Sequence, residues 1–220
     1  IVLAETPDTT IPDVLSAAID YNDVVASLTV YLSETIDVST VRPGRFYVTN
    51  HTGFPVAWAE DLQPEGWGGQ VAVQLDGATV LTHQDLMLFT VSMTEAQRVN
   101  ALAVSGVPGG DDNEGERSPV VLDVRHEALA DMAGVFLVND TNNAVVETPD
   151  TTPPQVLSAT FDYDDLVREL VVFASETIDV SSVNPSKVHL NNITGVVDRG
   201  VPLDGAVVNL ERDDLQFTIT

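Results

Sequence analysis

The stretch ETPDTTIPDVLSAAIDYNDVVASLTVYLSETIDVSTV, residues 5–41, recurs as ETPDTTPPQVLSATFDYDDLVRELVVFASETIDVSSV, residues 147–183. Aligning residues 4–53 with 146–195 needs no gap, and 29 of these 50 positions are identical. Chance does not produce this agreement, and an internal repeat decides the architecture before any other sequence feature does. The chain is therefore predicted to contain two copies of one module.

The two copies differ in length. After the shared stretch the offset between them falls from 142 to 128, because DGA at 76–78 matches DGA at 204–206, so the first copy holds an insertion of about 14 residues near 57–70. The second copy stops at Thr220, where the first copy continues. We predict a complete module with preceding linker residues over 1–146, and a copy truncated before its last strands over 147–220, as part of a longer array.

Short apolar runs separated by Gly, Pro and Asp turns are typical of β-strands. Seven such runs are predicted as strands: 14–19, 28–32, 46–48, 71–73, 79–81, 86–91 and 120–122. Strands of this number and length favour an all-β, two-sheet sandwich. One short helix is predicted to begin after Thr94, a threonine cap, and a second helical turn is predicted at 127–132, closed by Gly134.

Several motifs in this order resemble the immunoglobulin-like repeats of prokaryotic S-layer and large cell-surface proteins. The motifs are DTTPP (150–154), VLSATFDY (156–163), SETIDVSSVNPSKVHL (175–190), DGA, MTEAQR (93–98) and ALADMAG (128–134). The resemblance covers essentially the whole chain and implies tandem immunoglobulin-like β-sandwich modules, with one short helix per module, at the cell surface. The Asp-Leu-Ala-Gly-Asn usual in that family is here Asp131-Met132-Ala133-Gly134-Val135.

The charge is strongly acidic, with 34 Asp and Glu against 9 Lys and Arg and a net charge of −25. A surface of this sign repels nucleic acid and anionic membranes, so neither is expected as a partner. Two hypotheses explain how the repulsion is relieved: the carboxylates bind calcium, which prefers oxygen ligands, or they keep the protein soluble in concentrated salt. The absence of cysteine excludes disulfides and thiolate metal sites.

No enzyme motif is present, neither a nucleophile elbow, a zinc-protease helix nor a glycine-rich phosphate loop. The four histidines are scattered without the spacing of metal ligands. We therefore predict no catalytic residues and no enzymatic activity.

Calcium is predicted where one module meets the next. The first strand should run from the linker to the Asp-Tyr-Asn-Asp turn at 20–23, which places this turn at the far end of the module, next to the following linker. The predicted ligands are Asp20, Asn22, Asp23, Glu147, Asp150, Glu176 and Asp179. The alternative is that Asp8 and Asp150 build turns and that Glu34 and Asp37 cap a helical turn at 39–41.

Two further sets of residues are candidate surface sites. Asn50, Asn139 and Asn192 lie in Asn-x-Thr sequons and are predicted glycosylation sites. Trp58 and Trp67, the only tryptophans, lie in the insertion of the first copy among acidic residues. They are predicted to contact a sugar or another subunit, or to pack within their own loop.

These observations favour a structural, extracellular protein. The predicted function is a repeat array in an S-layer, sheath, filament or stalk, stiffened by calcium, with copies of itself as partners. The alternative is an adhesin in which the modules are spacers, and glycans or proteins are bound by Trp58 and Trp67 or by a region outside this sequence.

Overall fold

The computed structural model describes residues 5–22, 26–50, 72–106, 120–164, 168–192, 200–209 and 214–220. The chain forms two compact units, residues 1–152 and 153–220, each described here by itself. The protein is all-β, as predicted, with 43% of residues in strands and 13% in helices. Among the described residues no helix is long and apolar enough to cross a membrane.

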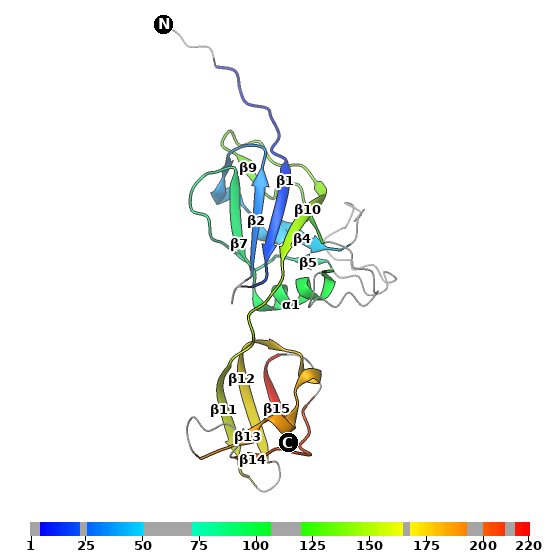
Figure 1. Ribbon diagram of the computed structural model, residues 1–220. Coiled ribbons are helices and arrows are strands. Elements are labelled where there is room, and N and C mark those ends of the chain that lie inside the picture. The colour runs from blue at the N-terminus through cyan, green and yellow to red at the C-terminus, as the bar shows by residue number, and fades with distance from the viewer. Residues whose placement is uncertain are drawn as a thin grey trace. The chain divides into compact units, whose positions relative to one another are not determined.

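Unit 1 is built on one eight-stranded sheet with the order β5-β4-β8-β10-β1-β2-β7-β6 (Figure 1). Its strands are β1 (Val14–Asp20), β2 (Ser27–Leu32), β4 (Phe46–Thr49), β5 (Val73–Gln74), β6 (Thr79–Val80), β7 (Leu88–Ser92), β8 (Val121–Val124) and β10 (Asp140–Thr148). A separate pair joins β3 (Ile36–Asp37) to β9 (Ala130–Asp131). The short helices are η1 (Val38–Thr40), η2 (Pro43–Arg45) and α1 (Glu95–Val104).

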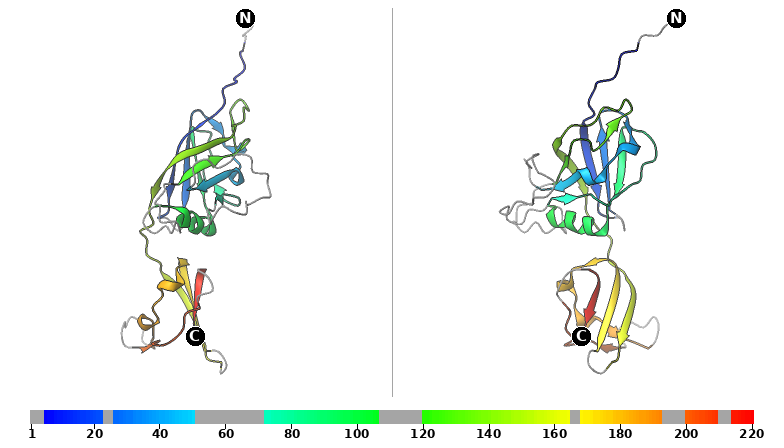
Figure 2. Two further views of the ribbon diagram at one scale, coloured as in Figure 1. Left: turned by 90° about the vertical axis from the view of Figure 1, so that its right-hand side faces the viewer. Right: turned by 180° about the vertical axis from the view of Figure 1, so that it is seen from behind.

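The sheet curls so that two groups of strands enclose one core. Strands β1, β2 and β7 form one layer, and β4, β5 and β8 lie behind them (Figures 1 and 2). Leu28, Val30 and Leu32 of β2 point inward at the strand period of two and are at most 1% exposed. Phe46 of β4 and Phe89 of β7 meet edge to face with ring centroids 5.5 Å apart. Each large apolar side chain buried in this core contributes about 1.5–3 kcal/mol of stability.

Strand β10 links the two layers. Its first half pairs antiparallel with β8, and its second half pairs parallel with β1, where Ala17 lies opposite Val145. The Val14 backbone N–H donates to Asp140 Oδ2 at 2.9 Å, which attaches the start of β10 to the start of β1. The sequence analysis missed this strand because its first half, Asp-Thr-Asn-Asn, has no apolar alternation. Pairing with two partners makes it a strand, and β10 runs into the second copy of the repeat.

The helix predictions had opposite outcomes. Helix α1 begins after Thr94 as predicted, and Thr94 and Gln97 form a capping box in which each side chain accepts from the backbone N–H of the other residue. The predicted helical turn at 127–132 is wrong, because β9 forms there by pairing with β3. A tight loop follows β9, in which Gly134 has φ +85, a value that favours glycine.

Unit 2 repeats part of this arrangement. Its elements are β11 (Val156–Asp162), β12 (Glu169–Ile178), η3 (Val180–Ser182), η4 (Pro185–Lys187), β13 (His189–Leu190), β14 (Val201–Pro202) and β15 (Asp214–Ile219). The order β11-β12-β15 matches β1-β2-β7, and Ala159 lies opposite Val172 as Ala17 lies opposite Val30. Strand β11 is largely exposed, unlike β1, because the described residues of unit 2 contain no counterpart of β8 and β10.

Candidate functional site

The end of unit 1 that carries α1 and residues 147–152, here called the C-terminal pole, contains a half-buried carboxylate, Glu147. Glu147 Oε1 accepts hydrogen bonds from the Tyr21 hydroxyl at 2.9 Å and from the Ser105 hydroxyl at 2.7 Å. Tyr21 is completely buried. Burial, together with the negative charge of Glu147, raises the pKa of Tyr21, so the phenol stays protonated and donates. Glu147, the first residue of the second repeat, thus completes the core of the first.

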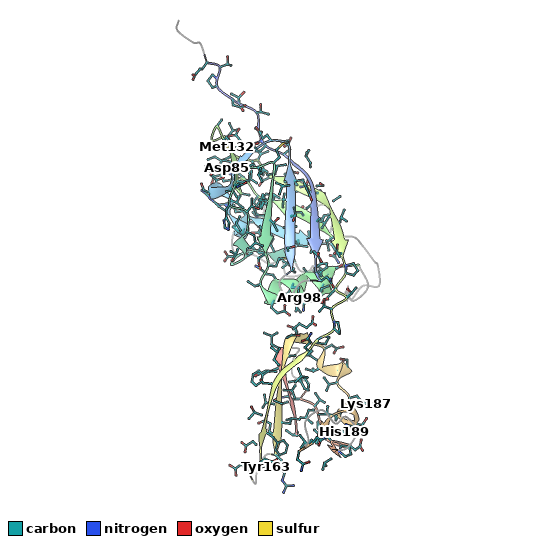
Figure 3. All side chains as sticks on the ribbon, turned by 60° about the vertical axis from the view of Figure 1, so that its left-hand side comes forward. Asp85, Arg98, Met132, Tyr163, Lys187 and His189 are labelled. Carbon is teal, nitrogen blue, oxygen red and sulfur yellow. The ribbon has the colours of Figure 1, made fainter. Side chains whose placement is uncertain are left out.

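Arg98 ties the linker to α1. Its side chain is nearly buried, and its Nε and Nη2 donate to the two carboxylate oxygens of Glu95, each at 2.8 Å. Its Nη1 donates to Asp150 Oδ2 at 2.8 Å. Figure 3 shows Arg98 at this end of the unit. Because guanidinium presents several donors in a rigid fork, one side chain can hold two carboxylates.

Asn22 binds the next two residues of the linker. Its Oδ1 accepts from the Thr151 backbone N–H at 2.9 Å and from the Thr151 hydroxyl at 2.7 Å. The Thr152 hydroxyl donates to the backbone carbonyl of Asn22 at 2.9 Å. The first residues of the second repeat are therefore attached to the end of unit 1 through side chains on two separate segments, the end of β1 and α1 with its C-cap.

The predicted calcium ligands at this pole form hydrogen bonds within the protein. Asp20 Oδ1 accepts from the Asn22 backbone N–H at 2.9 Å, and Asp150 Oδ1 accepts from the Thr152 backbone N–H at 2.9 Å. Asp150 thus closes a turn, as the alternative to calcium binding predicts. Asp8 closes the equivalent turn, since its Oδ1 accepts from the Thr10 backbone N–H at 2.9 Å. Calcium binding at this pole stays a prediction, and a cation there would compete with these donors.

The remaining predicted ligands are separate from this pole or undescribed. Asp23 lies outside the described residues. Glu176 and Asp179 belong to unit 2. Hydrogen bonds from Ser181 lower the pKa of Asp179, which caps η3 as Asp37 caps η1, so the predicted helical turn after Asp37 is confirmed. Asn22, Glu147 and Asp150 were predicted site residues, whereas Tyr21, Arg98 and Ser105 were not. The spacing Glu95-x-x-Arg98 on a helix was the available signal.

At the opposite end, the N-terminal pole, the structure brings three carboxylates together. Asp8, Glu34 and Asp131 each have an oxygen within 4.8 Å of the others. Asp131 is 2% exposed, and its Oδ1 accepts from the backbone N–H groups of Ala133 at 2.8 Å and Val135 at 2.7 Å. Its Oδ2 is buried and has no hydrogen-bond partner. This cluster was not predicted, because 97 residues separate Asp131 from Glu34 (131 − 34).

Glu34 is held in this cluster by the backbone around it. The Ser33 backbone N–H donates to the Asp13 carbonyl at 2.9 Å, and the Ile36 backbone N–H donates to the Leu86 carbonyl at 3.1 Å. Burial raises the pKa of Glu34, and the neighbouring carboxylates of Asp131, Asp8 and Asp13 raise it further. Figure 3 marks this end of the unit by Met132 and Asp85.

The other predicted surface residues have different environments. Asn139 is exposed, and its Oδ1 accepts from the His126 backbone N–H at 2.8 Å. Asn192 is exposed in unit 2, whereas Asn50 is half-buried with its Oδ1 enclosed and without a partner. Glycosylation stays a prediction, with Asn139 and Asn192 the more accessible acceptors. Trp58 and Trp67 lie outside the described residues.

A second buried carboxylate, Asp123 of β8, makes the stability of unit 1 depend on pH. Asp123 is 4% exposed, its Oδ1 accepts from the Asn142 backbone N–H at 2.7 Å, and its Oδ2 has no partner. Burial raises the pKa of Asp123, and the charge of Asp140 adds to the effect. The folded state therefore binds a proton on the Asp123 carboxyl more tightly than the unfolded state does. The contribution of Asp123 to stability falls as the pH rises from the unfolded-state pKa through the raised folded-state pKa.

We expect the Tm of Asp123→Asn minus the Tm of wild type to be more positive at pH 7 than at pH 4. The substitution removes the buried charge and keeps an oxygen for the Asn142 N–H. Thermal unfolding of both proteins at several pH values between 4 and 7 measures the difference in Tm. Asp20→Asn, a carboxylate with a similar turn hydrogen bond, is the control. A difference in Tm that does not vary with pH would contradict the assignment.

No known protein family, curated protein or solved structure matches the chain.

Proposed function

We propose that this protein is a structural protein of the cell surface, built from tandem immunoglobulin-like β-sandwich modules joined into a stiff array. The repeat supports this class, and so does the curled sheet that encloses one core, with the strand order β1-β2-β7 recurring as β11-β12-β15. An S-layer, sheath, filament or stalk is the kind of assembly that such an array serves.

One observation carries the proposal: the opening residues of the second repeat are bound into unit 1. Glu147 completes hydrogen bonds of the core, Asp150 pairs with Arg98, and Thr151 binds Asn22. A flexible tether needs no such contacts, and each one restricts the backbone where the chain leaves the module. The docked segment ends at Thr152, directly before Pro153 and Pro154, whose rings restrict their own backbone φ angles. A stiff connection suits a load-bearing or lattice-forming array.

Electron microscopy of intact source cells, labelled with gold-conjugated antibodies raised against the purified chain, tests the proposed location. We expect label outside the cell envelope, at regular spacing where the array forms a lattice or filament. Label confined to the cell interior, with permeabilised cells as the positive control, would contradict the proposal. Labelled fibres detached from the cells would indicate a filament, and labelled sheets would indicate a cell-wall lattice.

The linker attachment has its own test in solution. We expect Asn22→Ala to accelerate hydrogen exchange at the Thr151 amide by about threefold to tenfold, because the amide loses a hydrogen bond worth about 0.5–1.5 kcal/mol. Exchange measured by NMR gives the rate. Asn184→Ala, which removes a comparable cap of η4 in unit 2, should leave the Thr151 amide unchanged. Equal exchange at Thr151 in wild type and Asn22→Ala would show that the linker is not held.

The adhesin alternative depends on Trp58 and Trp67 or on other parts of a longer protein. The described residues include neither tryptophan, and none of the contacts above favours ligand recognition over module connection.

A further inference from the structure

We propose that Asp8, Glu34 and Asp131 form a calcium site at the N-terminal pole of unit 1. The inference deepens the proposed function and rests on it for the extracellular setting in which calcium is plentiful. The site differs from the junction ligands predicted from the sequence, since it draws on the loop after β9 and contains none of those residues.

Asp131 supplies the observation that separates this cluster from ordinary surface acids. Asp131 is 2% exposed. Its side chain accepts two hydrogen bonds, both at Oδ1, from backbone N–H groups of the loop that follows β9. Oδ2 is enclosed without any hydrogen-bond partner. An enclosed carboxylate oxygen without a partner is costly, and native proteins seldom leave one uncompensated. A cation bound to Oδ2 removes this cost.

Glu34 strengthens the case from a second segment. Its Oε1 is also buried and without a hydrogen-bond partner. None of the ion pairs formed between described residues involves Asp8, Glu34 or Asp131. Among the described residues, these three carboxylates thus face one another without a basic side chain paired to any of them. Such repulsion is relieved by a bound cation or by protonation.

The ligand type favours calcium, because magnesium is usually bound through one or two carboxylates and keeps several waters. Two oxygens on one calcium, each about 2.4 Å from the ion, can be up to about 4.8 Å apart, so one calcium can bind all three carboxylates. The oxygens of this cluster lie within 4.8 Å of one another. Three carboxylates offer three to six oxygens, and water completes the six to eight that calcium takes. Bound calcium would tie Asp8, in the first copy of the linker, to Glu34 after β2 and to Asp131 at the end of β9.

Isothermal titration calorimetry of the purified 220-residue chain tests the site with calcium, and with magnesium at matched ionic strength. We expect a calcium-selective binding event with a Kd of about 0.1–1 mM, the range of extracellular modules. Asp131→Asn keeps an oxygen for the loop N–H groups but removes the charge, and should weaken binding at least tenfold. Glu34→Gln should do the same, which covers the case in which Asp131→Asn fails to fold by circular dichroism.

Two control variants make the result specific. Asp85 lies at the same pole, and its Oδ1 accepts from the Val38 backbone N–H at 3.0 Å, so Asp85→Asn removes an equal charge outside the cluster. It should change the affinity less than twofold. Binding that survives Asp131→Asn and Glu34→Gln but is lost in Asp150→Asn would overturn the proposal in favour of the C-terminal pole. Equal responses to calcium and magnesium, or no binding at 10-fold above the expected Kd, would also overturn it. Calorimetry does not require assembly, so a failure to detect calcium binding would leave the array proposal standing. Gold label confined to the cell interior would contradict the array proposal but not the calcium site.

Discussion

Arg98→Ala is expected to lower the free energy of unfolding of unit 1 by about 3–5 kcal/mol. The Arg98 side chain is 5% exposed and holds Glu95 and Asp150, whose side chains are 26% and 18% exposed. Truncation leaves two neighbouring carboxylates without their cation, and they then repel each other. Hydrogen exchange at the buried amides of β2 measures this free energy in unit 1 alone, which a global melting curve of two units does not.

Arg42→Ala is the matched control for this prediction. Arg42 pairs with Glu127 at 3.6 Å, with both side chains largely exposed to solvent. Exposed ion pairs contribute about 0–1 kcal/mol, so this variant should stay within about 1 kcal/mol of wild type. Arg98→Lys should recover only part of the loss, because an ammonium cannot match the two-oxygen contact to Glu95. Equal effects of Arg98→Ala and Arg42→Ala would show that the buried network does not hold the linker.

Asp150→Asn separates the two roles of Arg98. This variant weakens the contact between the linker and α1 but leaves both hydrogen bonds from Arg98 to Glu95. Its cost should therefore be smaller than that of Arg98→Ala. Because the residues touch, the two substitutions should be non-additive in a double-mutant cycle. The coupling free energy measures how much of the stabilisation by Arg98 comes from its contact with Asp150 in the linker rather than from its contact with Glu95 in the helix.

Local sequence patterns predicted the elements that local chemistry determines. The alternation of Leu28, Val30 and Leu32 marks a strand with one buried face, and Thr94 marks a helix start. The Asp and Asn residues at 20–23 predicted a turn after the first strand, and β1 ends there at Asp20. These features need only residues close in sequence, so one chain suffices to predict them.

The missed features all depend on contacts between distant segments. Strand β10 is polar in its first half and forms because β8 and β1 supply partners on its two sides. Residues 127–132 have a helix-like composition, yet β3 recruits Ala130 and Asp131 into a strand pair. Likewise, the second repeat begins in the sequence at Glu147, but unit 1 extends to Thr152. The first residues of the second repeat therefore belong to the first compact unit.

Glu147→Ala is the second prediction with a large expected effect, about 2–4 kcal/mol in the stability of unit 1. Its Oε1 accepts from the completely buried Tyr21 hydroxyl and from Ser105, and its Oε2 lies 3.5 Å from the Val120 backbone N–H. A buried hydroxyl that loses its acceptor costs about 1–3 kcal/mol, and a network lost together costs more than one bond. Exchange at the β2 amides gives the value.

The repeat itself provides the control for Glu147, because Glu5 occupies the same position in the first copy and is exposed. Glu5→Ala should change stability by less than about 0.5 kcal/mol, as exposed substitutions do. Glutamate at this repeat position would thus be dispensable for the stability of unit 1 when it precedes the module, as Glu5 does. It would be essential when it follows the module, as Glu147 does. This asymmetry is expected if the opening residues of each repeat serve the preceding module, so that adding a module stabilises the one before it. Equal effects at Glu5 and Glu147 would instead mean that the repeats are independent domains on simple tethers.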